Sequence, residues 1–235
     1  MVAPRALCFD VFGTCVDWRG SIIAEGPVWD RRFGTSVDWA GLADAWRARY
    51  QPSMEAVRRG ERAFVNLDVL HRESLDELAP EFGLDGLSGD ERDELTRVWH
   101  RLDPWPDVMP GLNQLSGRIT LATLSNGGET LLAALAERGT LPWDHILSAE
   151  SFGAYKPLPT TYLGAVDRLG LRPDEVMMVA AHNDDLRAAA ALGLMTAFVA
   201  RPTEHGLGQT RDVEPDGPWA ICVDGFRALA AALAR

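Results

Sequence analysis

The residues ALCFDVFGTCVD, numbers 6–17, decide the fold of this chain. The apolar run Ala6–Phe9 ends at the carboxylate of Asp10, and a sharp turn through Gly13 and Thr14 follows. A short apolar run bounded by a turn is typical of a buried strand. Ligands bind at the carboxyl ends of the strands in open parallel sheets, so Asp10 is a candidate functional residue. An Asp at this position is also a common turn former, and alone it does not establish a site.

Strand-like and helical patterns alternate beyond residue 100. Apolar runs predict strands at 119–125, 145–150, 176–181, 196–200 and 220–224, and helical periodicity predicts helices at 129–139, 160–170, 184–193 and 226–235. Alternation of fully apolar strands with helices predicts a parallel sheet that is covered on both faces. The fold class is therefore α/β.

Residues 18–98 have a different character. They carry helical periodicity, including a predicted helix at 88–102, and almost no strand-like runs. The strand signal stops after Asp10 and resumes near Ile119, and the Pro-rich segment 102–111 leads back to it. We predict a core domain formed by residues 1–17 and 99–235, with residues 18–98 inserted as a helical cap over the sheet edge.

The composition limits the function. The chain has 235 residues, of which 46% are hydrophobic and 24% charged, so it can bury a sizeable core. Its formal net charge of −11 repels phosphate backbones and anionic membranes, so no nucleic-acid or membrane partner is expected. A small anionic substrate would need a local positive patch.

Cysteine usage and the lack of a targeting signal favour a cytoplasmic location. Cys8, Cys15 and Cys222 form no C-x-x-C pair, and their odd number argues against a disulfide framework. No secretory signal is recognisable, and no apolar stretch approaches the roughly 18 residues of a membrane span. Cys15 lies near Asp10, but the pattern offers no partner that would activate it as a nucleophile.

Polar residues follow further predicted strands. The triplets SNG at 125–127 and YKP at 155–157 and the run HNDD at 182–185 all come after apolar segments. Each is ordinary by itself, since a Lys before Pro is usually exposed and an Asp often begins a helix. Because parallel strands end at one edge of a sheet, all of them would meet Asp10 there. Turn chemistry does not readily explain such a convergence.

The motifs DVFGT, LSNG, YKP and HNDD, in this order, resemble those of the haloacid dehalogenase superfamily. The resemblance covers essentially the whole chain, including a helical cap between the first and second motifs. It is strongest to the type II branch, the L-2-haloacid dehalogenases. It implies a Rossmann-like core, Asp10 as the nucleophile, an aspartyl-ester intermediate, a small haloacid as substrate, no cofactor or metal, and a homodimer.

Phe12 separates a dehalogenase from a phosphatase. Most members of the superfamily are phosphohydrolases, in which a second Asp two residues after the nucleophile protonates an alkoxide leaving group. Phe12 occupies this position and cannot donate a proton. A halide leaving group needs no proton, and a carboxylate can displace it from an sp³ carbon. A purely structural role is also consistent with the sequence, in which Phe12 packs against the cap. The two roles are compatible.

The resemblance also assigns roles to individual residues. Lys156 would keep Asp10 ionised, Thr14 and Ser125 would hydrogen-bond the Asp10 or substrate carboxylate, and Asp185 would orient Lys156 or help activate water. The expected substrate- and halide-binding residues are Phe12, Arg47, Asn126, Tyr162, His182 and Asn183.

Two of these assignments have competitors. Arg49 is the rival of Arg47, and either could be an ordinary exposed helix residue. The fourth motif departs from the usual Ser-Ser-Asn run, since Ala180, Ala181 and His182 stand there instead. His182 could therefore serve as a base or as a neutral hydrogen-bond donor.

The sequence thus predicts a hydrolytic dehalogenase that converts a short (S)-2-haloalkanoic acid to the 2-hydroxy acid and halide, with inversion at carbon. The alternative is a magnesium-dependent phosphatase in which Asp10 and Asp184 or Asp185 hold the metal. A binding module without activity is disfavoured, because the acid–lysine–acid set is complete.

Overall fold

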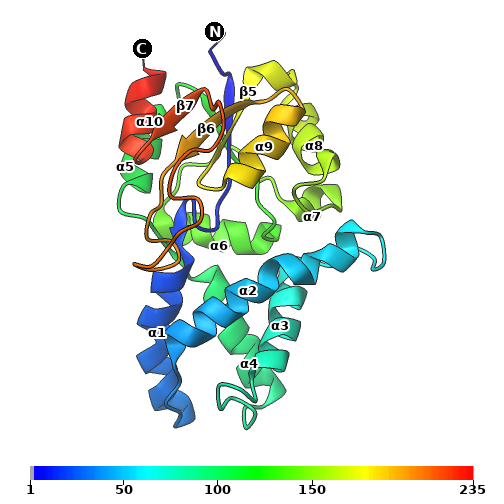
Figure 1. The fold of residues 1–235 in the computed structure, drawn as a ribbon, viewed down its shortest axis with the longest axis vertical. Helices are drawn as coiled ribbons and strands as arrows, with labels where there is room; N and C mark the ends of the chain where they lie inside the picture. Colours follow the sequence, from blue (N-terminus) through cyan, green and yellow to red (C-terminus); the bar gives the residue numbers. More distant parts are fainter. Residues whose placement is uncertain (1–2, 235) are drawn as a thin grey trace.

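A five-stranded parallel sheet forms the centre of the core. The computed structural model describes residues 3–234, in which the strands lie in the order β4, β1, β5, β6, β7 (Figure 1). Their bounds are Thr120–Thr123 for β4, Ala6–Phe9 for β1, Val176–Ala180 for β5, Met195–Val199 for β6 and Ile221–Val223 for β7. Every neighbouring pair in this sheet is parallel, which confirms the predicted α/β class.

Helices cover both faces of the sheet. Alternate residues of β1 point to opposite faces, so Leu7 and Phe9 pack with α5 (Val108–Leu115), α6 (Glu129–Gly139) and α10 (Phe226–Leu233). Ala6 and Cys8 pack instead with α8 (Pro159–Leu169) and α9 (Asn183–Ala191). The short α7 (Ala149–Phe152) precedes α8, and the 3-10 helix η2 (Pro173–Glu175) precedes β5.

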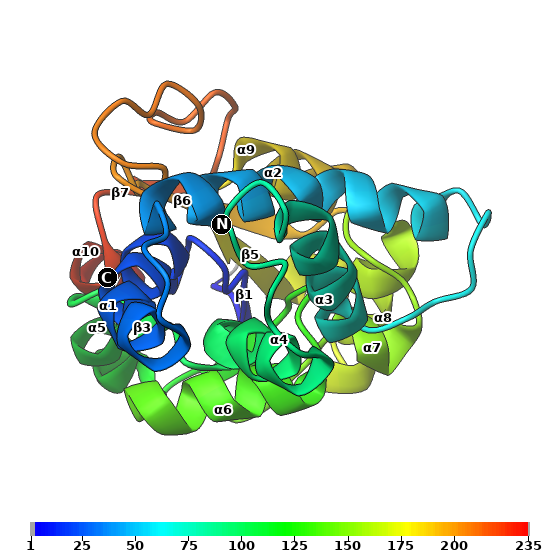
Figure 2. The same ribbon diagram turned by 90° about the horizontal axis from the view of Figure 1, so that it is seen from below.

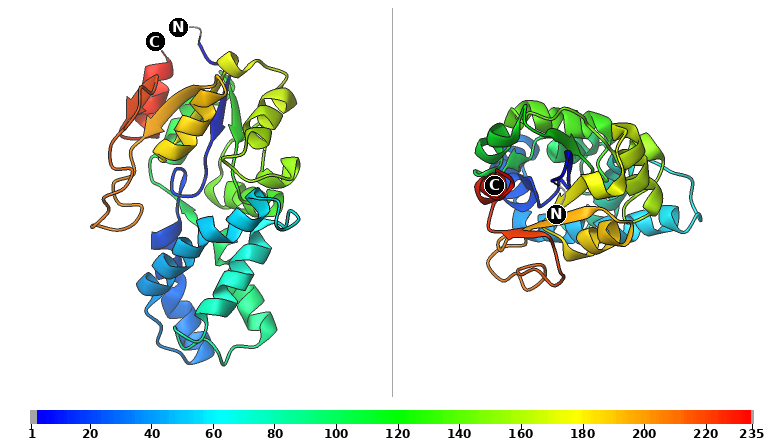
Figure 3. Two further views of the ribbon diagram at one scale, coloured as in Figure 1. Left: turned by 45° about the vertical axis from the view of Figure 1, so that its right-hand side comes forward. Right: turned by 90° about the horizontal axis from the view of Figure 1, so that it is seen from above.

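A separate helical layer lies at the carboxyl ends of the strands. It consists of α1 (Trp18–Phe33), α2 (Trp39–Arg58), α3 (Leu67–Leu78), α4 (Gly89–Thr96) and the 3-10 helix η1 (Arg97–His100) (Figures 1 and 2). Fully buried tryptophans, Trp18, Trp46 and Trp99, fill its centre. Both chain termini lie at the opposite end of the molecule (Figure 3).

A short antiparallel ribbon marks the two crossings between sheet and helical layer. β2 (Val16–Asp17) pairs with β3 (Asp103–Pro104). The Asp17 side chain accepts a hydrogen bond from Gly20 N at 2.8 Å and so caps the first helix of the layer. The outgoing and returning chains are therefore held together at one place.

The predicted strand at 145–150 is wrong. Only isolated bridges join His145 to Ala122 and Ser148 to Ser125, and α7 begins at Ala149. The Thr123 hydroxyl exchanges two hydrogen bonds with the Leu147 backbone, both 2.9 Å, and so interrupts the backbone pairing at this point. Backbone hydrogen bonds remain on either side, from Thr123 N to His145 O at 3.0 Å and from Ala149 N to Ser125 O at 2.8 Å. The Ser148 side chain then accepts from Glu150 N and starts the helix. The segment therefore lies alongside β4 as predicted, but it pairs through isolated bridges and does not form a regular strand.

Two predicted helices differ at their ends. The helix expected at 88–102 is α4 followed by η1, and it begins with a capping box between Ser88 and Glu91. The last helix stops at Leu233, and the predicted end at Arg235 lies outside the described residues. In residues 3–234, no helix combines the length and the apolar character that crossing a bilayer requires.

The turn after β1 is built around Gly13. Its φ of +82° lies in the left-handed region, and its N–H donates to Val16 O at 3.1 Å. A Cβ at this position would lie 2.1 Å from Glu204 Oε1, so a side chain here would displace the Glu204 carboxylate. The absence of a side chain at Gly13 leaves room for the Glu204 carboxylate beside the end of β1.

Candidate active site

The Asp10 carboxylate lies just past the end of β1 and is 7% exposed. Its Oδ1 accepts from Lys156 Nζ at 2.9 Å, and its Oδ2 accepts from the Thr14 hydroxyl at 2.7 Å and lies 3.1 Å from His182 Nδ1. Burial favours the neutral acid, but the charges of Lys156 and His182 outweigh burial and hold the pKa of Asp10 far below its ordinary value. Asp10 is therefore a desolvated but ionised carboxylate, as a nucleophile requires.

Lys156 is the only lysine in the sequence. Its ammonium bridges Asp10 Oδ1 and Asp185 Oδ2, and the Tyr162 hydroxyl donates to Asp185 Oδ1 at 2.6 Å. Burial acts to lower the pKa of Lys156, yet the two carboxylates outweigh it and raise this pKa well above the ordinary lysine value. Burial raises the pKa of Asp185 in spite of the adjacent ammonium. The predicted acid–lysine–acid set is thus brought together in one cluster.

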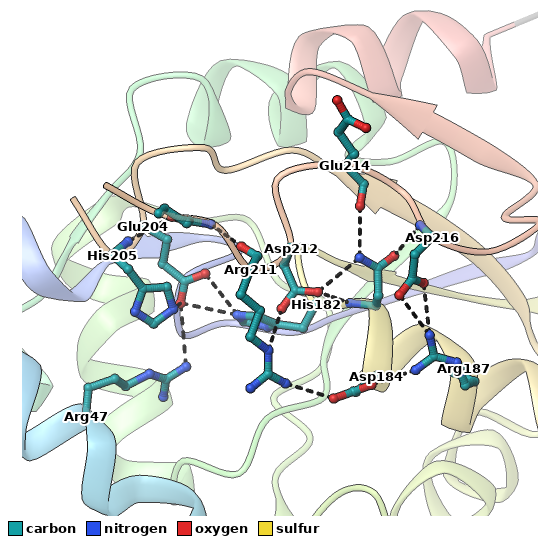
Figure 4. A network of polar contacts seen from close by, with 12 residues as sticks. Arg47, His182, Asp184, Arg187, Glu204, His205, Arg211, Asp212, Glu214 and Asp216 are labelled. Atoms are coloured by element: carbon teal, nitrogen blue, oxygen red, sulfur yellow. Dashed lines mark hydrogen bonds and ion pairs between the residues drawn. The ribbon is translucent and has the colours of Figure 1, made fainter. Parts of the chain in front are cut away.

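Glu204 belongs to the same cluster, and the sequence motifs did not indicate it. It lies in the loop after β6, is 1% exposed, and accepts from Trp18 Nε1 at 3.0 Å. His182 Nε2 lies 3.0 Å from its Oε2, and Arg47 Nη2 lies 3.6 Å from its Oε1 (Figure 4). Burial acts to raise the pKa of Glu204, but the neighbouring His182 lowers it to about 2. Glu204 therefore carries a negative charge inside the protein.

His182 lies between two carboxylates. Each ring nitrogen is within hydrogen-bond distance of one acid, Asp10 or Glu204. Burial acts to lower the pKa of His182, but Glu204 and Asp10 outweigh it and raise this pKa to about 10. Both nitrogens then carry protons and donate, which defines His182 as a cation in this state of the protein. The neutral-donor interpretation of His182 does not fit this geometry.

Arg47 offers an unpartnered donor to the cavity. Its guanidinium lies 4.3 Å from the Tyr50 ring centroid and 5.5 Å from that of Trp18. Its Nη1 is buried without a hydrogen-bond partner among residues 3–234. Its rival Arg49 pairs with Glu77 near the surface and does not line the cavity. A buried, unpaired N–H next to a cavity is suited to an anionic ligand.

Phe12 and Asn126 also line the cavity. Phe12 is 1% exposed and packs edge-on against Trp99 and Tyr50, with ring centroids 5.8 Å and 6.2 Å away. The Asn126 side-chain oxygen accepts from Lys156 N at 2.8 Å. The cavity therefore has an aromatic wall where a phosphatase would carry its proton donor.

Two predicted site residues lie elsewhere. Ser125 is fully buried, accepts from Gly127 N at 3.2 Å, and makes no hydrogen bond to Asp10. The Asn183 amide donates to Asp212 Oδ1 and Glu214 O and accepts from Asp216 N and Trp219 Nε1. Asn183 therefore anchors the loop after β6 and does not face the cavity, so its prediction as a binding residue is corrected.

A cavity of about 970 Å³ opens between the helical layer and the sheet. Its inner end contains Asp10, Phe12, Arg47, Tyr50, Asn126, Lys156, Tyr162, His182 and Asp185. Its outer part is bounded by Gln51, Glu55 and Arg58 of α2, by Arg59 after this helix, and by Asp184, His205, Arg211 and Asp212. In the part of the chain that the structure describes, no cluster of three or more His, Cys, Asp or Glu side chains is arranged to hold a metal ion.

The fold and the site define an α/β protein with a buried, ionised carboxylate at the carboxyl end of a parallel sheet. The sequence profile of the haloacid dehalogenase-like hydrolases matches residues 4–193. The chain belongs to this family.

Relatives with this fold extend over nearly the whole chain. The chain is 30% identical to (S)-2-haloacid dehalogenase 1 of Pseudomonas sp. (strain CBS-3) over 88% of this chain and 90% of the relative. Its sequence is 47% identical to that of the L-2-haloacid dehalogenase PA0810. The crystal structure of PA0810 superimposes on this structure with a TM-score of 0.95 and covers 98% of this chain and 99% of that one. The defluorinating L-2-haloacid dehalogenase Rha0230 is also 47% identical, with a TM-score of 0.96 over 99% and 96%.

Proposed function

We propose that this protein hydrolyses short (S)-2-haloalkanoic acids to 2-hydroxy acids and halide. The observation that carries the proposal is an ionised, buried Asp10 beside the aromatic side chain of Phe12, with no acid two residues after the nucleophile. Relatives named as haloacid dehalogenases support it. Residues 18–98 would act as the cap that closes the cavity over Asp10.

The first step is displacement at carbon. A carboxylate oxygen of Asp10 attacks C2 of the substrate, the new C–O bond forms as the carbon–halogen bond breaks, and the halide leaves with the bonding electrons. Attack from the side opposite the halide inverts C2. The unpaired Arg47 N–H is suited to the halide or the substrate carboxylate, and Lys156 keeps Asp10 ionised.

The second step is hydrolysis of the aspartyl ester. Esterification removes the negative charge of Asp10, which is one of the two charges that raise the pKa of His182. His182 then loses a proton more easily, and Glu204 still holds its other nitrogen. We assign water activation to His182, because its Nδ1 lies 3.1 Å from Asp10 Oδ2, beside the ester that would form. His182 gives one proton to solvent and then takes a proton from the attacking water, whose oxygen bonds to the carbonyl carbon of the ester. The bond between this carbon and the substrate oxygen breaks, and the departing oxygen takes the proton from His182. The 2-hydroxy acid leaves with C2 still inverted, and the Asp10 carboxylate is restored.

The phosphatase alternative is less well supported. Asp184 would be one metal ligand, but its oxygens accept hydrogen bonds from Arg187 and Arg211 near the surface. Asp185 is engaged by Lys156 and Tyr162. A metal ion held by Asp10 and Asp185 would have to displace the Lys156 ammonium, which bonds both carboxylates.

Halide release decides between the two functions. The protein should release chloride from (S)-2-chloropropionate with EDTA present, form the (R)-hydroxy acid, and leave the (R)-substrate largely untouched. Fluoroacetate belongs in the same assay because one relative is described as defluorinating. No halide from any of these acids, together with magnesium-dependent cleavage of a phenyl phosphate, would contradict the proposal.

Glu204→Gln should block the second step more than the first. Without the buried charge the pKa of His182 falls from about 10, and the histidine loses the partner that holds it for water activation. We expect kcat to fall by about 10²-fold, with the Asp10 ester accumulating to a level that mass spectrometry of quenched reactions detects. Glu214→Gln is the matched control, since this exposed acid lies in the same loop and bonds Asn183 only through its backbone.

The pH dependence of stability gives a second readout for Glu204. A raised folded-state pKa of His182 contributes stability that is fully present below its unfolded value near 6.5 and is lost as the pH rises through about 10. Glu204→Gln should remove much of this contribution. The depressed pKa of Glu204 adds stability that is lost as the pH falls from 4.5 toward about 2, so the deficit should be largest between pH 4.5 and 6.5 and shrink toward pH 10. A variant with normal hydrolysis and an unchanged pH profile would exclude the assigned role.

We also propose a cytoplasmic location, because Cys8, Cys15 and Cys222 are all free thiols. A homodimer, which the family resemblance suggests, stays a prediction that size-exclusion chromatography with light scattering can test.

A further inference from the structure

We propose that Arg58 is a positioning residue that couples the helical layer to Lys156. The inference rests on the proposed function for its effect on turnover, but the contacts that carry it are independent of the substrate. Arg58 is the last residue of α2, and its Nε donates to Lys156 O at 2.9 Å. This hydrogen bond joins the helical layer to the backbone of the residue whose side chain contacts the nucleophile.

Lys156 is fixed on three sides. Its N–H donates to Asn126 Oδ1 at 2.8 Å, its carbonyl accepts from Arg58, and its ammonium bridges Asp10 and Asp185. The first and third contacts come from the core. The second comes from α2, so a shift of the helical layer would change the backbone position of Lys156 directly.

Arg58 is itself held in one conformation. Its side chain is 10% exposed, and its Nη2 donates at 2.7 Å to Oε1 of Gln51, which lies two turns earlier on the same face of α2. Its Nη1 lies 3.5 Å from Glu55 Oε2. A guanidinium with this many fixed contacts presents its Nε–H in a defined direction, which a flexible surface arginine does not.

The helical layer contacts the same core segment a second time. The Tyr155 hydroxyl donates to Val65 O at 2.6 Å, and the Phe64 and Tyr155 ring centroids are 5.1 Å apart. The C-terminal part of α2 extends along the side of the core where α7 and α8 lie (Figures 1 and 2). Contacts of the helical layer therefore converge on residues 155 and 156, immediately before α8.

A displacement of the Lys156 ammonium would lower kcat more than it would weaken substrate binding. The ammonium must stay near Asp10 while charge moves from the carboxylate to the leaving halide, and small displacements of such groups reduce the rate strongly. Arg58 borders the cavity, but its hydrogen bonds go to Lys156 O and to residues of α2, and none goes to Asp10. Its loss should lower kcat and leave KM nearly unchanged, since Arg47 remains in place.

Arg58→Met tests this coupling against the matched control Arg59→Met. Arg59 also borders the cavity, but its Nε donates only to Glu55 and its side chain is 63% exposed. We expect Arg58→Met to lower kcat about tenfold, with KM within about twofold of the parent. Arg59→Met should change neither by more than about twofold. Arg58→Lys, which keeps a donor that can reach the carbonyl, should restore most of the lost kcat.

The single lysine provides a readout that needs no substrate. Labelling with [15N]lysine gives one backbone amide signal, that of Lys156, whose hydrogen exchange can be followed by NMR in the free protein. Arg58→Met should speed this exchange about tenfold and Arg59→Met should not, because only the former frees the Lys156 backbone. If Arg58→Met does not fold, Arg58→Gln takes its place.

The outcomes separate the two proposals. If the parent protein releases no halide, the proposed function fails and the amide exchange alone decides on Arg58. If the parent is active and Arg58→Met retains its kcat and its slow exchange, the coupling is refuted. Equal losses of kcat in Arg58→Met and Arg59→Met would also refute the coupling, since such losses would reflect only the removal of a positive charge from the edge of the cavity.

Discussion

Replacing Asp10 by Asn is expected to abolish halide release. The Asn amide keeps the shape of the side chain and can still accept from Thr14 or Lys156, but it has no anionic oxygen to attack carbon. Loss of a nucleophile typically lowers kcat by roughly 10⁵- to 10⁶-fold, and no aspartyl ester should form. Chloride release and mass spectrometry of the quenched enzyme measure both effects.

The control for Asp10→Asn is Asp184→Asn. Asp184 borders the same cavity, but its side chain is exposed and bonds Arg187 and Arg211. Its replacement should leave kcat within about twofold of the parent. Mass spectrometry should also verify that residue 10 remains Asn during the assay. Turnover above about 1% of the parent in intact Asp10→Asn would remove Asp10 as the nucleophile.

Lys156→Met is expected to damage both catalysis and stability. Without the ammonium, Asp10 and Asp185 face each other as buried like charges, so at least one of them takes up a proton near neutral pH. Removing one partner of a buried ion pair lowers the free energy of unfolding by about 3–5 kcal/mol. We expect kcat to fall by at least about 10³-fold.

The pH used for the stability measurement matters. The folded-state pKa of Lys156 is raised, so its contribution is fully present below the unfolded value and is lost only as the pH rises through the folded value. The depressed pKa of Asp10 adds a contribution that is present above the unfolded value and lost as the pH falls. Urea unfolding at pH 7 therefore captures both contributions.

A double variant distinguishes charge imbalance from loss of packing. Lys156→Met with Asp185→Asn removes one of the two unpaired acids, so it should recover part of the lost stability without recovering turnover. Arg118→Met, which removes an exposed cation of the core, should change stability by no more than about 0.5 kcal/mol. No recovery in the double variant would contradict the ion-pair explanation.

The sequence predicted which residues meet at the site where those residues directly follow strands of the sheet. Asp10 and His182 follow fully buried strands, and the carboxyl ends of parallel strands share one edge, so their meeting could be expected. Lys156 was assigned correctly to this edge although the preceding segment, 145–150, is not a regular strand. The lysine reaches Asp10 from the turn between α7 and α8, where the motif rather than the strand pattern located it.

The sequence did not predict contacts made by loops and helix surfaces. Glu204 lies in residues 200–220, a long segment without hydrophobic periodicity, and only its unusual length was a signal of function. Asn183 was predicted to bind substrate, but its side chain bonds Asp212 and Trp219. The sequence pattern of a polar residue at a helix start is the same whether its side chain faces a cavity or anchors a loop. Ser125 makes no hydrogen bond to Asp10, because its hydroxyl oxygen accepts from the Gly127 backbone, and its predicted contact with the substrate carboxylate stays a prediction.

The single lysine has a consequence for the protein surface. Because Lys156 is buried against Asp10, every cationic side chain on the surface at high pH is an arginine, as in the pairs Arg19–Asp44 and Arg62–Glu73. Lysine ammonium groups lose their protons near pH 10.4, whereas guanidinium groups stay charged above pH 12. The surface ion pairs therefore persist in alkaline solution, where a lysine-rich relative would lose half of each pair.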